Sequence, residues 1–152
     1  SKGATGALGE ERMRALGIDR PLPPELHTRL LRILDDGHCG KAPEKYVAGM
    51  VDAQRARDAV MAEVLARQTG TAVLIAGNGH VRRDLGVPLY LSRMAPDAKT
   101  LAVGFIEVED ERRSATDYAG AFDGRFDYVW FTVRQEREDP CKGLSFSETK
   151  SQ

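Results

Sequence analysis

The spacing of apolar positions predicts helices in the first half of the chain. Apolar residues recur with a helical period over residues 5–16, 24–36 and 43–68. Gly17 and Gly70 are suited to end the first and the last of these segments. The middle segment begins at Pro24, a residue that the first turn of a helix accepts.

The period changes after residue 70. Thr71–Ala76 is a continuous apolar run, which is typical of a strand buried on both faces of a parallel sheet. A helix or a pair of short helices over 80–94 and a strand over 100–108 would follow it as a right-handed βαβ unit. Residues 109–125 are charged and predict a loop with one short helix near Tyr118. A third strand is expected over 127–133.

These elements predict one α/β domain, a parallel sheet flanked by helices with a small helical subregion. Its parts would be a helical subregion over 1–42, an α/β core over 43–133 and a polar C-terminal tail over 134–152, expected to be partly disordered. A length of 152 residues fits a single domain.

Composition narrows the classes of partner. The chain is 30% charged with a net charge of −1, so it has no general electrostatic reason to bind nucleic acid or an anionic membrane. No apolar stretch is long enough to span a bilayer, and the first residues, Ser1 to Gly6, do not resemble a signal peptide. Cys39 and Cys141 are expected to be separate thiols, and a disulfide, which would indicate an oxidising compartment, is the alternative.

Polar residues interrupt the apolar face predicted for the longest helix. Gln54, Arg57 and Asp58 fall in the same arc as Tyr46, whereas Arg55 falls on the solvated side. A buried guanidinium needs a carboxylate, carbonyl groups or an anionic ligand. Arg57 is therefore expected either to pair with an aspartate or to line a polar cleft.

The loop Gly77-Asn78-Gly79-His80 follows the first predicted strand. It lacks the third glycine of a dinucleotide loop and the lysine of a Walker A loop, so nucleotide binding is not expected. Its position at the carboxyl end of a parallel strand would deliver His80 into a cleft, unless the ring only caps its own helix. One histidine does not make a metal site, and only His38 is placed to join it.

Five segments together resemble a known family. They are HCG at 38–40, MVDAQRARDAVMAEVL at 50–65, AGNGHVRRDLGVPLYL at 76–91, VGFIEVE at 103–109 and DYVWFT at 127–132. In order and spacing, over residues 10 to 141, they are similar to the ChaN-like haem-binding uptake family. A wider resemblance, carried by Arg57-Asp58 and the G-x-x-H of residues 77–80, extends to the TraB and Tiki group and to erythromycin esterases.

The resemblance implies a location and a ligand. Family members are bacterial cell-envelope proteins, often lipoproteins, so this chain is expected in the envelope or periplasm, with a lipid anchor on a segment missing from it. It resembles the second half of the family domain, whose first half carries a G-E-x-H motif that Gly9–Arg12 does not match. The resemblance also implies haem held by a tyrosinate in a pocket at a homodimer interface.

Tyr46 is the preferred haem-iron ligand among the four tyrosines, since Arg57 would favour its phenolate and hold a propionate. His80 is the alternative ligand or a neighbouring group. The full set expected to bind haem is Tyr46, Arg57, His80, Gln54, Asp58, Asn78, His38 and Tyr90. The expected function is haem binding for iron uptake or storage. The alternatives are a metal-dependent hydrolase of the Tiki or esterase kind and an inactive folded fragment.

Overall fold

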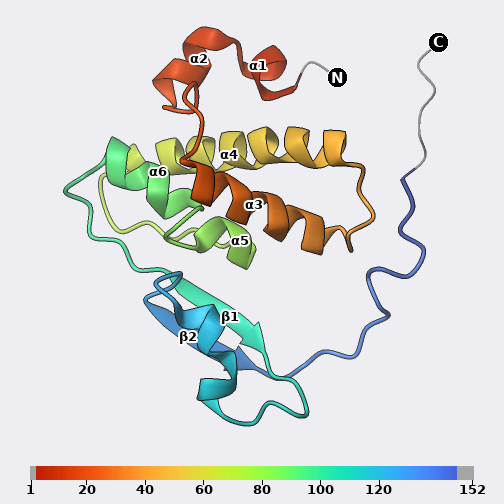
Figure 1. The fold of residues 1–152 in the computed structure, drawn as a ribbon. Helices are drawn as coiled ribbons and strands as arrows, with labels where there is room; N and C mark the ends of the chain where they lie inside the picture. The colour runs from red at the N-terminus through yellow and green to blue at the C-terminus, as the bar shows by residue number, and fades with distance from the viewer. Residues whose placement is uncertain (1–2, 147–152) are drawn as a thin grey trace.

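A computed structural model describes residues 3–146 of the chain as a helical layer beside a small sheet (Figure 1). In chain order the elements are α1 (Gly3–Leu8), α2 (Glu10–Ala15), α3 (Pro24–Gly37), α4 (Glu44–Ala66), α5 (Asn78–Val81), α6 (Val87–Met94), β1 (Val103–Glu107), the 3-10 helix η1 (Ala115–Tyr118), α7 (Ala119–Phe122) and β2 (Tyr128–Thr132). The mixed α/β class predicted from the sequence is confirmed. The single helix expected over 5–16 is two helices, because Gly9 takes a φ of 77° between them.

The helix α4 is the centre of the helical layer. Two apolar clusters form around it, one toward α6 and the other toward α3. The first consists of Leu16, Ile18, Ala59, Ala62, Val87, Tyr90 and Leu91. The second consists of Leu22, Leu30, Val51 and Leu85. The N-terminal region therefore contributes to the same core as α4 and α6.

The apolar face of α4 differs from the predicted one. Arg55, expected on the solvated side, is 8% exposed, and its Nη2 donates to the carbonyl of Arg20 at 2.5 Å. Arg57, expected in the middle of the buried face, is exposed. Ala59 and Ala62 are fully buried, and their small side chains let α6 pack closely against this side of α4. The large apolar residues of α4 fall on about half of the helix, and the buried face is rotated from the centre of that half toward Arg55, Ala59 and Ala62.

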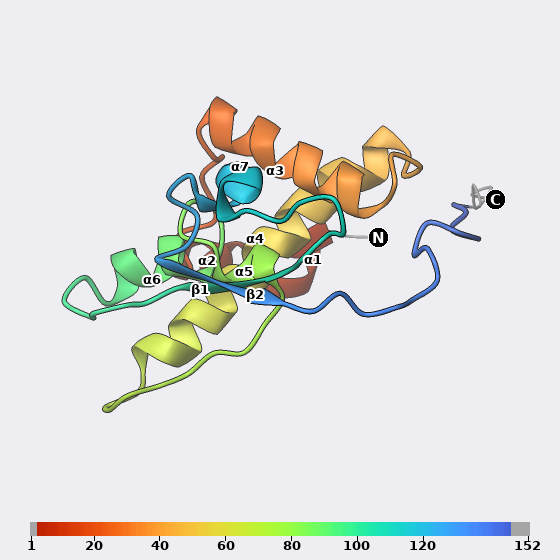
Figure 2. The same cartoon turned by 90° about the horizontal axis from the view of Figure 1, so that it is seen from below.

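The sheet is formed by two parallel strands, β1 and β2, with Phe105 opposite Trp130. Their connection passes through η1 and α7, which cover one face of the sheet (Figures 1 and 2). On that face the rings of Tyr118 and Phe131 lie 5.1 Å apart, and Gly104 leaves room for the ring of Phe126. The strands expected over 100–108 and 127–133 are thereby confirmed.

The strand predicted over Thr71–Ala76 does not form, and this prediction is wrong for the described chain. The segment is extended but pairs with no strand, and Val73 and Ile75 are 80% and 93% exposed. A β-strand needs a neighbouring backbone for its hydrogen bonds. Among the described residues no strand lies alongside this segment.

A disulfide joins Cys39 to Cys141 across 102 residues of sequence. The expectation of two separate thiols is therefore wrong. The bond ties the C-terminal tail to the turn between α3 and α4, where Lys41 Nζ also donates to the carbonyl of Cys141 at 2.8 Å. Between residues 134 and 146 the tail contains no helix or strand. The end of the predicted disordered tail, residues 147–152, lies outside the described residues.

None of the described helices is long and apolar enough to cross a membrane.

Candidate functional site

Asp58 of α4 and His80 of α5 form a hydrogen-bonded pair. The Nδ1 of His80 lies 2.6 Å from Oδ1 of Asp58, which is 1% exposed. The His80 side chain is 24% exposed, so its ring joins the buried carboxylate to the surface. The sequence predicted both residues for one site, and the structure brings them together.

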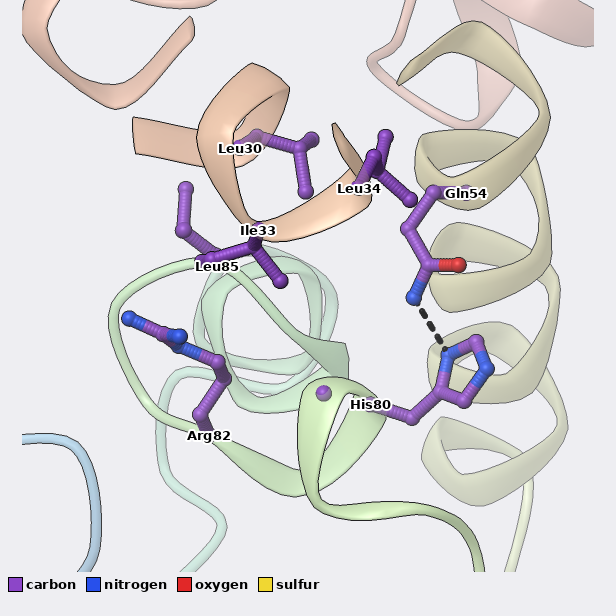
Figure 3. Close-up of a pocket in the computed structure, with 8 residues that line it drawn as sticks. Leu30, Ile33, Leu34, Gln54, His80, Arg82 and Leu85 are labelled. Carbon is purple, nitrogen blue, oxygen red and sulfur yellow. Dashed lines mark hydrogen bonds between the residues drawn. The ribbon is translucent and has the colours of Figure 1, made fainter. Parts of the chain in front are cut away.

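The geometry fixes the tautomer of His80. Gln54 Nε2 lies 2.9 Å from the same Nδ1 (Figure 3). An ionised carboxylate can only accept, and its contact with Nδ1 is the shorter of the two, so we assign the proton to Nδ1, which donates to Asp58. The amide nitrogen of Gln54 can also only donate, so in this tautomer its hydrogen bond goes to the Asp58 carboxylate and not to Nδ1. The Nε2 of His80 then keeps a free lone pair. A histidine oriented in this way by a carboxylate is a basic ligand for a metal ion.

Burial has the largest effect on the pKa of Asp58. It raises the pKa of the carboxyl from 3.8 to about 6, against the opposing effects of His80, Gln54 and Arg57. At neutral pH the Asp58 carboxyl group is therefore mostly ionised, and it accepts a hydrogen bond from His80 Nδ1.

A cavity of about 240 Å³ lies beside this pair. Leu30, Ile33 and Leu34 of α3 form an apolar wall, and Gln54 and His80 lie on another side (Figure 3). Leu85, Gly79 and Arg82 complete the lining. The cavity is thus apolar on one side and polar on the other, as ligand pockets commonly are.

Two arginines share one aspartate near the cavity, an arrangement that the sequence analysis did not predict. Arg82, 6% exposed, donates from Nε and Nη2 to both carboxylate oxygens of Asp84 at 2.6 Å. Arg29 of α3 donates to Asp84 at 2.8 Å. Burial alone would raise the pKa of Asp84, but the two guanidinium groups outweigh it and lower the pKa. The trio carries one net positive charge. The sequence signal was the run Arg82-Arg83-Asp84, which begins two residues after His80.

The turn that follows α5 depends on Gly86. A Cβ at residue 86 would overlap the backbone carbonyl group of His80 and lie 2.8 Å from the carbonyl oxygen of Arg82. The backbone N–H of Gly86 also donates to the backbone carbonyl oxygen of Arg82 at 2.9 Å, and this bond closes the turn. The absence of a side chain therefore permits the close approach that positions His80.

Five of the eight residues expected in the site lie outside the pair and the cavity lining: Arg57, which is exposed on α4, Tyr46, His38, Asn78 and Tyr90. Tyr46 is exposed on the first turn of α4, 12 residues before Asp58 and thus about 18 Å away along the helix axis. His38 bonds through Nδ1 to the carbonyl of Leu34 at 2.6 Å and does not line the cavity. Asn78 bonds through its amide to both the N–H and the C=O of Phe105, which attaches α5 to β1.

Tyr90 is 1% exposed within the core, and its burial raises the pKa of the phenol. Its hydroxyl has no hydrogen-bond partner among the described residues. A raised pKa keeps the phenol neutral, so Tyr90 is poorly suited to be a tyrosinate ligand.

The described part of the chain contains no group of three or more His, Cys, Asp or Glu side chains that could hold a metal ion. The pair of Asp58 and His80 is thus suited to support one coordination position, in which the histidine donates and the aspartate orients it.

The family described as haem-binding uptake, Tiki superfamily, ChaN, matches residues 1–91, which is more than half of the chain. The chain belongs to this ChaN family. No curated protein and no solved structure matches it. The matched residues include α3, α4, α5 and most of α6, and therefore the whole lining of the cavity.

The residues of this ChaN family member suit the chemistry of haem. Haem offers an iron that accepts an imidazole, an apolar macrocycle and anionic propionates. The free Nε2 of His80, the leucine and isoleucine wall of α3, and the net positive trio of Arg29, Arg82 and Asp84 correspond to these three parts. A cavity of about 240 Å³ holds only part of a macrocycle, so much of the ligand would extend from it.

Proposed function

We propose that this chain binds haem through the Nε2 of His80, for haem uptake or storage at the bacterial cell envelope. The observation that carries the proposal is the pair of Asp58 and His80 at the edge of an apolar cavity, in a chain of the ChaN family. Haem would supply an iron that binds imidazole ligands. Asp58 would orient the His80 imidazole and make it more basic, and the apolar residues of α3 would contact the macrocycle.

His80 is better placed than Tyr46 to bind the iron. Arg57 is exposed and lies far along α4 from Tyr46, so it does not favour the Tyr46 phenolate as the sequence analysis expected. The net positive group of Arg29, Arg82 and Asp84, and not Arg57, would bind a propionate. Tyr46 thus serves as a matched control, because it is an exposed potential ligand about 18 Å away along α4.

Haemin titration tests the proposal. The wild-type chain is expected to shift the Soret band of haemin and to saturate at a fixed stoichiometry. His80→Ala should weaken binding at least about tenfold, and Asp58→Asn by about 10- to 100-fold through loss of the orienting carboxylate. Tyr46→Phe should bind as the wild type does.

Two outcomes would contradict this assignment. Haem binding that survives His80→Ala but is lost in Tyr46→Phe would restore Tyr46 as the ligand. A wild-type chain that leaves the Soret band unchanged at stoichiometric haemin would remove haem binding itself.

The disulfide supports the proposed location. Bonds such as Cys39–Cys141 form and persist in oxidising compartments, including the bacterial periplasm, and are rare in the cytosol. An envelope location is also what the resemblance to ChaN-like proteins implied.

The same pair of Asp58 and His80 is suited to a second activity, metal-dependent hydrolysis, in which the imidazole acts as a general base. This alternative predicts ester or amide hydrolysis that requires a divalent metal ion and is lost in His80→Ala. Such hydrolysis, found without a Soret shift, would replace the haem proposal.

A further inference from the structure

The helix that presents His80 is too short to hold its own position. α5 has four residues, Asn78–Val81, and a helix of one turn is unstable without tertiary contacts. It lies between α4 and β1 (Figure 1). The bond from Asp58 of α4 ends on the ring of His80, so the backbone of this segment needs other contacts to fix it.

The sheet holds the segment on the N-terminal side of His80. The side-chain amide of Asn78 donates to the carbonyl of Phe105 at 2.5 Å and accepts from the N–H of the same residue at 3.1 Å. Phe105 is the central residue of β1. Asn78 thus takes the place of a neighbouring strand for one residue of β1, two positions before His80.

A second attachment lies on the C-terminal side of His80. Three residues after it, the backbone N–H of Arg83 donates to the carbonyl of Arg125 at 2.8 Å. The Nη1 of Arg83 donates to Oδ2 of Asp127 at 2.6 Å, and Asp127 directly precedes β2. His80 is therefore flanked by bonds to β1 on one side and by bonds to the start of β2 on the other.

Asp127 joins Arg83 to the start of both strands. Its Oδ2 also accepts from the backbone N–H of Ala102 at 2.7 Å, and its own N–H donates to the carbonyl of Ala102 at 2.8 Å. The Ala102 N–H and the Arg83 guanidinium hold the pKa of Asp127 below its ordinary value, although burial opposes them. Asp127 is thus ionised at neutral pH, and its bond to Arg83 is charge-assisted.

We propose that Asp127 is a positioning residue for His80, acting through Arg83, while Asn78 holds the other end of the segment 78–83. A metal ligand has to keep its orientation within narrow limits, and fixing both ends of a short segment restricts how far His80 moves from Asp58. This role rests on the proposed function, because it concerns the support of the proposed iron ligand. Asp127 lies outside residues 1–91, which match the ChaN family.

Nitrogen-15 NMR of the His80 ring in haem-free protein at neutral pH tests the proposal. In the wild type the proton is expected on Nδ1, bonded to Asp58. In Asp127→Asn and in Arg83→Gln the ring should leave Asp58 for part of the time, so the chemical shifts of the two ring nitrogens should move toward each other. Arg83→Gln keeps the bonds between Asp127 and Ala102, so it separates the positioning of His80 from the folding of the sheet.

Glu107→Gln is the matched control. Glu107 of β1 has a side chain that is 31% exposed, as that of Asp127 is, and it pairs with Arg137 at 2.8 Å. Arg137 belongs to the C-terminal tail and not to the segment that carries His80. Glu107→Gln should therefore keep the ring shifts of the wild type.

Haemin affinity gives the functional readout. Asp127→Asn and Arg83→Gln should each weaken haemin binding about tenfold, the lower end of the range for residues that support a metal ligand, and Glu107→Gln should bind as the wild type does. Wild-type ring shifts in Arg83→Gln would overturn the proposal, and so would shifts that Glu107→Gln alters equally. The NMR measurement needs no haem, so a wild type that fails to bind haemin would remove the proposed function and leave the positioning result intact.

Discussion

At the scale of single residues, the proposed site depends on Asp58, a carboxylate whose burial disfavours its charged form. Asp58 is 1% exposed and bonded to His80, yet its burial raises the pKa to about 6. In an unfolded chain the pKa of aspartate is about 3.9. The folded state therefore binds more protons than the unfolded state between about pH 4 and pH 6.

This difference predicts how Asp58 affects stability. Because a raised folded-state pKa favours the protonated form, the contribution of Asp58 falls as pH rises from 4 to 6 and is constant above that. Relative to Asp58→Asn, the wild type should lose up to about 3 kcal/mol of unfolding free energy across this range. Urea unfolding of both proteins from pH 4 to pH 7 measures the difference. An unchanged difference would mean that the carboxyl titrates normally.

At the scale of elements, helix packing decided which polar side chains of α4 are buried. Ala59 and Ala62 turn one side of α4 toward α6, and Arg55 is buried with them while Arg57 remains in solvent. Arg55 is satisfied in part by the carbonyl of Arg20 at 2.5 Å. Its Nε has no partner among the described residues. Arg55 is thus a structural residue that joins α4 to the N-terminal region.

The two arginines provide a matched pair of substitutions. Arg55→Ala should lower the free energy of unfolding by about 2–4 kcal/mol, because it leaves a cavity beside Tyr90 and an unpaired carbonyl at Arg20. Arg57→Ala should change it by less than about 0.5 kcal/mol, as exposed substitutions usually do. Urea denaturation of the two variants compares them directly. The opposite order would favour the helix face predicted from the sequence.

At the scale of the whole molecule, the chain combines a well-packed helical layer with a two-stranded sheet that is covered on one face (Figure 1). The haem site proposed for this ChaN family member belongs to the helical layer. The disulfide acts across the helical layer and the sheet, since it ties the tail after β2 to the turn between α3 and α4.

Loss of the disulfide should therefore destabilise the whole chain. Cys39→Ala/Cys141→Ala should lower the free energy of unfolding by about 2–5 kcal/mol, mainly because a loop of about 100 residues is no longer closed in the unfolded state. Urea denaturation of the wild type with reductant should reproduce the loss. The double variant should not respond to reductant. A wild type that is equally stable with and without reductant would contradict this expectation.

The sequence by itself determined the elements whose signals are local. The apolar stripe and Pro24 specify α3, and the strand patterns over 100–108 and 127–133 specify β1 and β2. His80 is presented as predicted after residue 77, but by the short helix α5, which already includes Asn78 and Gly79, and not by a loop. The sequence also indicated the ChaN family and paired Asp58 with His80 in one expected site.

The tertiary structure decided whatever depends on partners far apart in the chain. The pairing of Cys39 with Cys141, the burial of Arg55 instead of Arg57, and the positive trio at Asp84 each join separate elements. Thr71–Ala76 has the composition of a strand but lacks a neighbour to pair with. Apolar spacing records how well a segment suits burial, whereas burial itself requires another surface, and a single segment does not encode which surface that is.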